Sequence, residues 1–253
     1  MRRRGTRDLS WARGGVARAV REVLLRGVLG PLIDLYTRGR IVGRDHLAGL
    51  EGPVLFVANH SSHMDTPTIL RALPRAWRRR TAVAAAADYF YRVPWLGRAV
   101  SLAFNTVPVQ RKGEAGAPGA ASELTRLIDE GWSLLVFAEG TRSRDGTVGR
   151  LRSGAAVLAA DRGLVIVPVY VSGTHAVMPP GRRWMHRRRG RFRGGRHPIA
   201  VHFGPPVRPG DDEHRTDVME RIRLFFEASG ALTTPDKRIA ARDRRSASRP
   251  SAP

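Results

Sequence analysis

Residues 54–65, VLFVANHSSHMD, are the stretch on which the prediction of the fold depends. The first five residues form an apolar run of strand length, which ends just before a polar turn that contains His60. Asp65 closes the stretch and stands directly before Thr66 and Pro67, a pair typical of the start of a helix. A buried strand that ends in an imidazole and a carboxylate places titratable groups at the edge of a sheet, where open α/β folds bind their ligands.

The spacing of His60 and Asp65 decides how their side chains can meet. On one continuous helix, residues five apart are rotated by roughly 140° and separated by about 7.5 Å, so their side chains diverge. They meet only if the chain turns after the strand and Asp65 lies where the next helix begins. The carboxylate would then orient the imidazole, whose other nitrogen is left to take a proton from a hydroxyl. Two alternatives fit the same spacing: Asp65 is a helix N-cap, or His60, His63 and Asp65 bind a metal ion such as zinc.

The composition narrows the class of protein and the kind of partner. The chain has 253 residues, no internal repeat and no linker in its middle, which predicts one domain with loose ends. It has no cysteine, so disulfides, thiolate nucleophiles and cysteine zinc sites are excluded. Lys and Arg number 44 against 22 Asp and Glu, a formal net charge of +22. This charge predicts an anionic partner: a nucleic acid, an anionic membrane surface or a phosphorylated substrate.

Two segments bear on membrane binding. No apolar run approaches the roughly 20 residues of a transmembrane helix, and the first residues lack the pattern of a signal peptide. Residues 16–36 carry apolar side chains at helical spacing with arginines between them, and Gly27, Gly30 and Pro31 are expected to divide the segment in two. This amphipathic segment either lies in a membrane interface or packs on the core of the domain. Residues 182–196 contain eight arginines with aromatic side chains, which suits a loop at an anionic membrane surface or a nucleic-acid arm.

An alternation of strand-like and helix-like patterns runs from residue 54 to residue 171, inside a domain expected to span residues 37–230. It predicts an α/β domain with a mostly parallel or mixed central sheet flanked by helices. The basic ends, residues 1–15 and 231–253, are predicted to be disordered. The predicted strands are 40–43, 54–58, 81–87, 104–109, 133–138, 164–171 and 199–203, and the predicted helices are 66–73, 123–130, 154–161 and 216–229, with 88–101 helical or irregular.

Further polar groups follow two of these strands. The sequence EGTR at residues 139–142 comes directly after the strand at 133–138, and a glycine, a hydroxyl and a guanidinium suit an anion such as phosphate. Arg111 follows the strand at 104–109 in the same way. Pro168 lies inside a predicted strand, which indicates a sheet edge, a bulge or a strand end at that point.

Taken together, these segments resemble the ordered motifs of the glycerolipid acyltransferases, and most closely those of the 1-acyl-sn-glycerol-3-phosphate acyltransferases. The resemblance covers about residues 40–226. It implies that His60 is the catalytic base and that Asp65 is its charge partner. The resemblance further implies that the phosphate of the acceptor binds to Arg111, Glu139, Gly140, Thr141 and Arg142. It also implies that three positions support these motifs, namely Asn59, Ser143 and Pro168. One departure is Ala138, where the family commonly has a proline, and this affects the subtype more than the chemistry.

The activity implied by this resemblance is transfer of a fatty acyl group to the free hydroxyl of 1-acyl-glycerol-3-phosphate, giving phosphatidate. The donor would be acyl-CoA or acyl-carrier protein, and neither a metal nor another cofactor is expected. The resemblance and the two basic segments together predict a peripheral or monotopic protein at the cytoplasmic face of an anionic membrane. A different lyso-lipid or glycolipid acceptor is an alternative, and a basic nucleic-acid-binding protein is a remote one.

Overall fold

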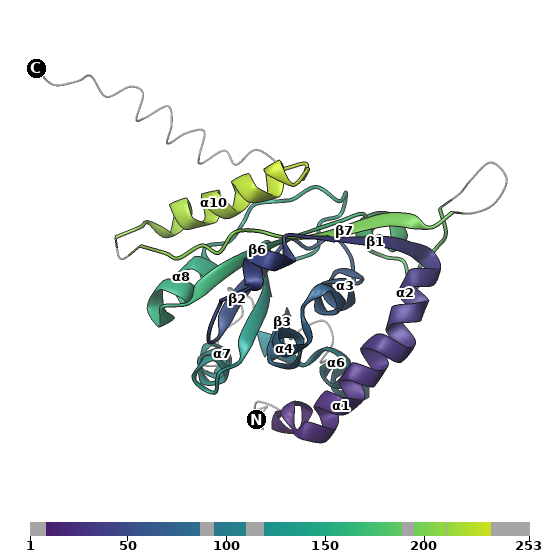
Figure 1. Cartoon of the computed structure of the whole chain (residues 1–253), viewed down its shortest axis with the longest axis horizontal. Coiled ribbons are helices and arrows are strands. Elements are labelled where there is room, and N and C mark those ends of the chain that lie inside the picture. The colour runs from purple at the N-terminus through teal and green to yellow at the C-terminus, as the bar shows by residue number, and fades with distance from the viewer. Residues whose placement is uncertain (1–8, 87–93, 110–118, 189–194, 211, 234–253) are drawn as a thin grey trace, which may run out of the picture.

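The computed structural model describes residues 9–86, 94–109, 119–188, 195–210 and 212–233, and within them a seven-stranded sheet runs through the centre of the molecule (Figure 1). The strand order is β1-β7-β6-β2-β5-β3-β4. Strands β6, β2, β5, β3 and β4 are mutually parallel, whereas β7 is antiparallel to β6 and β1 is parallel to β7. The predicted α/β fold with a mixed sheet is therefore confirmed. The strands are β1 (Thr37–Val42), β2 (Val54–Ala58), β3 (Thr81–Ala86), β4 (Thr106–Val109), β5 (Ser133–Phe137), β6 (Val165–Ser172) and β7 (His197–Phe203).

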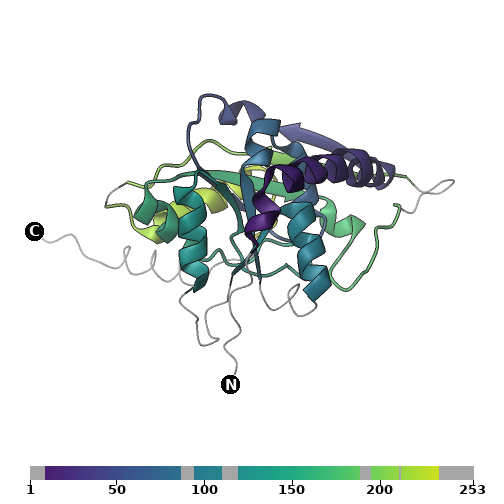
Figure 2. The same cartoon turned by 90° about the horizontal axis from the view of Figure 1, so that it is seen from below.

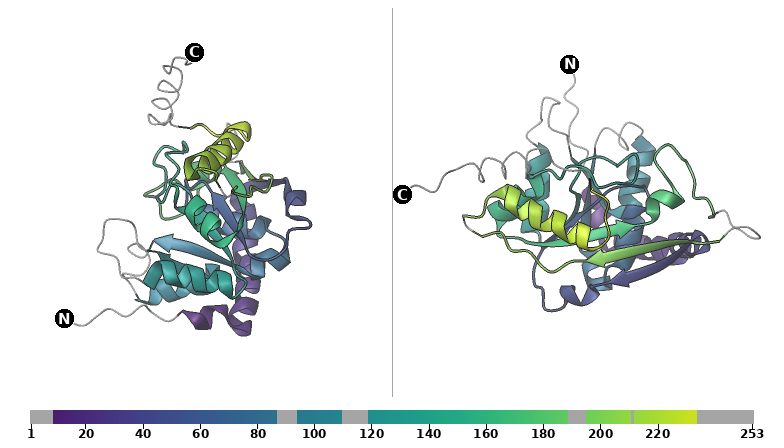
Figure 3. Two further views of the ribbon diagram at one scale, coloured as in Figure 1. Left: turned by 90° about the vertical axis from the view of Figure 1, so that its left-hand side faces the viewer. Right: turned by 90° about the horizontal axis from the view of Figure 1, so that it is seen from above.

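Helices cover both faces of the sheet, as the views in Figures 1 and 3 show. The N-terminal run consists of the 3₁₀-helix η1 (Ser10–Arg13), α1 (Gly15–Val23), the π-helix η2 (Leu24–Leu29) and α2 (Gly30–Tyr36). The remaining helices are η3 (Arg44–Leu47), α3 (Asp65–Ala72), α4 (Arg75–Arg79), α6 (Pro94–Phe104), α7 (Gly119–Asp129), α8 (Gly154–Arg162), α9 (Thr174–Val177) and α10 (Arg215–Ala228).

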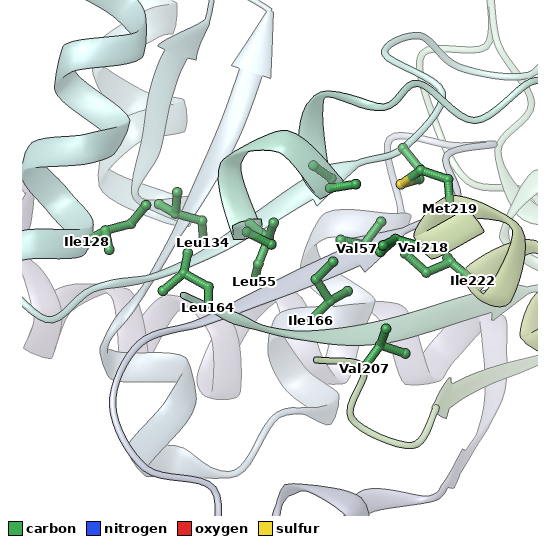
Figure 4. Packing of buried hydrophobic residues seen from close by; sticks show 14 of the residues in the cluster. Leu55, Val57, Ile128, Leu134, Leu164, Ile166, Val207, Val218, Met219 and Ile222 are labelled. Carbon is green, nitrogen blue, oxygen red and sulfur yellow. The ribbon is translucent and has the colours of Figure 1, made fainter. Parts of the chain in front are cut away.

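Alternate residues of β2 point to opposite faces of the sheet, as the period of a strand requires. Leu55 and Val57 join a core that includes side chains of α7, α8 and α10 (Figure 4). Phe56 and Ala58 join a second core with α3 and with Leu25 of η2. Because β2 is buried on both faces between β6 and β5, it reads in the sequence as a continuous apolar run.

The boundary between α6 and β4 differs from the prediction. The strand expected at 104–109 begins at Thr106, because Phe104 is the last residue of α6 and Asn105 turns the chain with a φ of 53°. Phe104 packs against the core, so its apolar character could not distinguish a helix end from a strand start. Residues 94–101 of the segment expected to be helical or irregular belong to α6, and residues 87–93 lie outside the described residues.

Pro168 lies in β6, which is an inner strand with β2 and β7 as neighbours. The proline faces a bulge in the neighbouring segment. Two residues lie between Ile166 and Val169 on β6, and three lie between their partners Val207 and Phe203. Its carbonyl accepts a hydrogen bond from the Gly204 amide at 2.8 Å. Of the three expected settings for this proline, the structure comes nearest to the bulge, whose extra residue lies in the segment that faces the proline.

The N-terminal run is helical from Gly15 to Tyr36, and it lies across the helices of one face as the purple rod in Figure 2. The expected break near Gly27, Gly30 and Pro31 is a change of helix type, from the π-helix η2 to α2. Pro31 falls in the first turn of α2, where its missing N–H removes no bond of that helix. No helix of the described residues is both long and apolar enough to cross a bilayer.

The inner side of this run is held by polar contacts as well as by apolar packing. Buried Arg21 donates to the carbonyl oxygens of Leu102 at 2.9 Å and Ser101 at 3.2 Å, in the last turn of α6. Burial lowers the pKa of Arg21 to about 10, so the guanidinium stays charged at neutral pH beside the negative end of that helix. Glu22 pairs with Arg78 of α4 at 2.7 Å.

The two predicted disordered ends are ordered at their inner margins. Residues 10–13 form η1, and Arg13 pairs with Glu123 of α7 at 2.9 Å. At the other end, Thr233 bridges to Val148. Residues 1–8 and 234–253 lie outside the described residues.

Candidate active site

The turn after β2 begins with Asn59, whose side chain prolongs the pairing of β2 with β6. Its Nδ2 donates to the Val171 carbonyl oxygen at 3.0 Å, and its Oδ1 accepts from the Val171 amide at 2.7 Å. The amide side chain thus replaces a backbone rung of the sheet at the point where the chain leaves the strand. His60 is presented at the carboxyl ends of β2 and its neighbours.

Asp65 is fully buried at the first position of α3, and its carboxylate folds back over the turn. Its Oδ2 accepts from His60 Nδ1 at 2.9 Å and from the amides of Ser61 at 2.7 Å and Ser62 at 2.8 Å. The N-cap of α3 is Met64, so the carboxylate holds the preceding turn and does not cap its own helix. The chain turns as the spacing required, and the structure brings His60 and Asp65 together.

The contacts of His60 fix both its tautomer and its ring plane. A carboxylate can only accept hydrogen bonds, so the neutral imidazole carries its proton on Nδ1 and its lone pair on Nε2. Nε2 has no hydrogen bond to the described residues, and the side chain is 18% exposed. The ring stacks on Phe137 at the end of β5, with centroids 3.9 Å apart and planes inclined by 18°. A base in this setting can take a proton from a hydroxyl placed at Nε2.

Glu139 is buried beside this turn, and both of its carboxylate oxygens are occupied by backbone amides. Oε1 accepts from the His60 amide and Oε2 from the Gly149 amide, each at 2.8 Å. Burial raises the pKa of Glu139, and the two amides oppose that rise. In this geometry the carboxylate ties the turn after β2 to the loop after β5.

The next residues of the 139–142 segment form a tight turn. Gly140 has a φ of 69°, and a Cβ at this position would lie 2.8 Å from Nε of Arg152. That Nε donates to the Glu139 carbonyl oxygen at 3.1 Å, so the arginine covers the turn. Thr141 is exposed, and the amide of Ser143 donates to the His60 carbonyl oxygen at 2.8 Å. The segment is therefore bonded to His60 at its start, through Glu139, and just after its end, through Ser143.

Arg142 points to His63, whose Nε2 lies 2.6 Å from its Nη1. Burial, followed by the charge of Arg142, lowers the pKa of His63 to about 4, so the imidazole is neutral at pH 7 and accepts this hydrogen bond. His63 therefore faces a cation and does not join His60 and Asp65 as a third ligand. Arg111, the remaining residue expected in the phosphate site, lies outside the described residues.

Comparison with known proteins now bears on this arrangement. The family model described as Acyltransferase matches residues 38–172, more than half of the chain, and the match includes the His60–Asp65 turn and the 139–142 segment. The chain belongs to the acyltransferase family.

Several curated acyltransferases are similar to this one. The 1-acyl-sn-glycerol-3-phosphate acyltransferase of Limnanthes douglasii is 31% identical over 173 residues, which cover 68% of this chain and 55% of that protein. The chloroplastic 1-acyl-sn-glycerol-3-phosphate acyltransferase LPAT1 of Arabidopsis thaliana is 31% identical over 143 residues, 56% of this chain and 38% of that protein. The chain thus spans between about two fifths and just over half of the length of these relatives.

A solved acyltransferase has the same fold. The crystal structure of the 1-acyl-sn-glycerophosphate acyltransferase PlsC from Thermotoga maritima superposes with a TM-score of 0.60 at 24% sequence identity, and the match covers 90% of this chain and 85% of that one.

Some residues at the candidate active site of this acyltransferase were not predicted. Phe137 stacks on His60 and Arg152 covers the 139–142 turn. Thr174, the first residue of α9 after β6, donates to Asp65 Oδ1. The one signal in the sequence is that Thr174 also follows a predicted strand, after Ser172 and Gly173. Pro168 lies within β6 and has no hydrogen bond to His60 or Asp65 in the described part of the chain.

Proposed function

We propose that this acyltransferase transfers a fatty acyl group from a thioester to the free hydroxyl of 1-acyl-glycerol-3-phosphate and so makes phosphatidate. The observation that carries the proposal is the buried Asp65 carboxylate on His60 Nδ1, which leaves Nε2 directed away from the pair and ready to accept a proton. The names of the curated relatives support the choice of acceptor.

The proposed reaction needs only a base, a held acceptor and an activated donor. His60 Nε2 takes the proton of the acceptor hydroxyl while that oxygen attacks the thioester carbonyl carbon. Asp65 stabilises the imidazolium that forms. The tetrahedral intermediate then breaks its C–S bond, and the departing thiolate receives the proton from the imidazolium. The products are the new ester and the free thiol of CoA or of acyl-carrier protein.

The acceptor phosphate is proposed to bind at the 139–142 segment. Arg142 supplies a guanidinium that matches a phosphate, and Thr141 supplies an exposed hydroxyl. On the basis of the sequence alone, we propose that Arg111 completes the phosphate site. Glu139 and Gly140 are proposed to act through the backbone, since the carboxylate holds the turn and the glycine permits it. Bonding of this segment to the His60 turn would set the distance from phosphate to base.

The protein is proposed to work while bound peripherally to an anionic membrane. The outward side of the N-terminal run carries exposed apolar side chains, with Val16 at 80%, Val23 at 67% and Val28 at 53% exposure. Trp184, at 59% exposure, lies within hydrogen-bonding reach of the Tyr36 hydroxyl at the end of α2, in the arginine-rich segment. An apolar row bordered by arginines suits an interface of acyl chains and lipid phosphates.

An acceptor panel tests the proposal. Purified protein is given one acyl-CoA, or one acyl-carrier-protein thioester, with lysophosphatidate, lysophosphatidylcholine, lysophosphatidylglycerol or a lyso-glycolipid. We expect lysophosphatidate to have the highest kcat/KM, because a terminal phosphate offers the most charge to Arg142. A higher kcat/KM for another lyso-lipid would identify that lipid as the acceptor in place of lysophosphatidate. Failure to acylate any of the four would overturn the proposed function.

A further inference from the structure

We propose that Thr174 is a positioning residue for the His60–Asp65 pair, and that Ser61 acts through it. Asp65 has two carboxylate oxygens with different partners. Oδ2 receives His60 and two backbone amides, whereas Oδ1 receives one hydrogen bond from the described residues, from the hydroxyl of Thr174. The assignment rests on the proposed function, in which this pair is the base.

The fold places Thr174 at this point through a turn that only glycine permits. Gly173 follows β6 with a φ of 81°, and a Cβ there would lie 2.1 Å from the Pro198 carbonyl oxygen. The turn begins the short helix α9, whose first residue is Thr174, and the threonine is fully buried. Since β6 is parallel to β2, its carboxyl end lies beside the turn that carries Asp65.

The direction of each hydrogen bond follows from counting protons. The Asp65 carboxylate has no proton to give, so the Thr174 hydroxyl donates its one proton to Oδ1. Ser61 Oγ lies 3.3 Å from Thr174 Oγ1. Because the proton of Thr174 is already used, Ser61 must donate to Thr174. The two buried hydroxyls form a chain that ends on the carboxylate, and each donor polarises the next.

These hydrogen bonds fix the rotation of the Asp65 carboxylate. With Oδ2 held by the turn and Oδ1 held by Thr174, the carboxyl plane is defined by two separate elements, the turn after β2 and the start of α9. The same region is anchored once more where Ser62 Oγ donates to the Met178 carbonyl oxygen at 2.8 Å. Loss of the Thr174 bond would leave one carboxylate oxygen unpaired in a buried site and free the plane to turn away from His60.

The test compares Thr174→Val, which keeps the shape and removes the hydroxyl, with Thr174→Ser, which keeps the hydroxyl. The matched control is Thr68→Val on α3, because the Thr68 hydroxyl is buried and has no hydrogen-bond partner among the described residues. We expect Thr174→Val to lower kcat by about tenfold or more with the acceptor KM within about twofold of wild type. Thr174→Ser and Thr68→Val should stay within about threefold of wild type. Ser61→Ala should show a smaller loss of kcat than Thr174→Val.

A second readout does not depend on catalysis. The proton on His60 Nδ1, which is shared with Asp65, is observed by NMR in the enzyme without substrate. We expect its resonance to move or broaden in Thr174→Val and to keep its wild-type position in Thr174→Ser. An unchanged resonance in Thr174→Val, or a serine variant no better than the valine variant, would overturn the role of Thr174. A displaced resonance in a protein whose wild type transfers no acyl group would uphold that role and overturn the proposed function alone.

Discussion

Asp65 and Glu139 are both buried carboxylates at the carboxyl ends of neighbouring strands, yet they hold different partners. Asp65 holds the imidazole of His60, whose other nitrogen is proposed to take the proton of the acceptor hydroxyl. Among the described residues, Glu139 accepts hydrogen bonds only from the backbone amides of His60 and Gly149. The first carboxylate is therefore suited to stabilise a charge that forms during the reaction, and the second to keep the turn in place.

Glu139→Gln tests this distinction. The glutamine amide has one acceptor oxygen, so its NH₂ group would face one of the two backbone N–H groups that the carboxylate now accepts from. We expect a loss of about 1–3 kcal/mol in the free energy of unfolding and a lower kcat, with the acceptor KM little changed. Thermal unfolding and steady-state kinetics measure both.

The control for this substitution is Glu130→Gln. The carboxylate of Glu130 makes an exposed salt bridge with Arg126. It should change the unfolding free energy by less than about 1 kcal/mol. If Glu139→Gln instead raised the acceptor KM at unchanged kcat and stability, Glu139 would contact the substrate directly.

The N-terminal run buries two of its charged side chains against the domain and exposes several of its apolar ones. Arg21 and Glu22 make ion pairs and carbonyl contacts with α6 and α4, while Val16 and Val23 face away from the domain. The sequence pattern left open whether the apolar stripe packs on the core or on lipid. In the structure, Leu25 and Ile33 on the inner side pack on the domain. The exposed valines on the outer side are left for the contact with lipid that we propose.

The double substitution Val16→Glu with Val23→Glu tests the outward side. Burial of a valine side chain in lipid is worth about 1.5–3 kcal/mol, and two carboxylates would add repulsion from anionic lipid. We expect at least a tenfold weaker affinity for vesicles that contain phosphatidylglycerol, measured by sedimentation. Stability should stay within about 0.5 kcal/mol, because both positions are exposed.

The matched control is Leu224→Glu, an exposed apolar position on α10 in the opposite helix layer (Figures 1 and 3). It makes the same kind of change in charge and should leave vesicle affinity nearly unchanged. Leu224→Glu adds one negative charge and the double substitution adds two. A loss of binding free energy from Leu224→Glu that is half or more of the loss from the double substitution would point to net charge alone and contradict a role for the N-terminal run.

At the scale of the whole molecule, the sequence predicted what depends on local pattern. The strand β2 and the turn that joins His60 to Asp65 lie within twelve residues, so their periodicity and spacing were sufficient. Thr174 reaches Asp65 across 109 residues, and that contact depends on β6 lying next to β2. β1 and β7 run opposite to the other strands of the sheet, and this direction is likewise a property of the sheet order, which the hydrophobic pattern does not encode.

The most direct test of the account is acyl transfer to lysophosphatidate by wild type and His60→Ala, compared at equal protein and equal vesicle binding. We expect the variant to keep its fold and its affinity for vesicles while the rate falls by about 10²–10⁴-fold, the usual contribution of a positioned base. A folded His60→Ala variant that keeps more than about a tenth of the wild-type rate would contradict the account, because the proton would then be taken by another group.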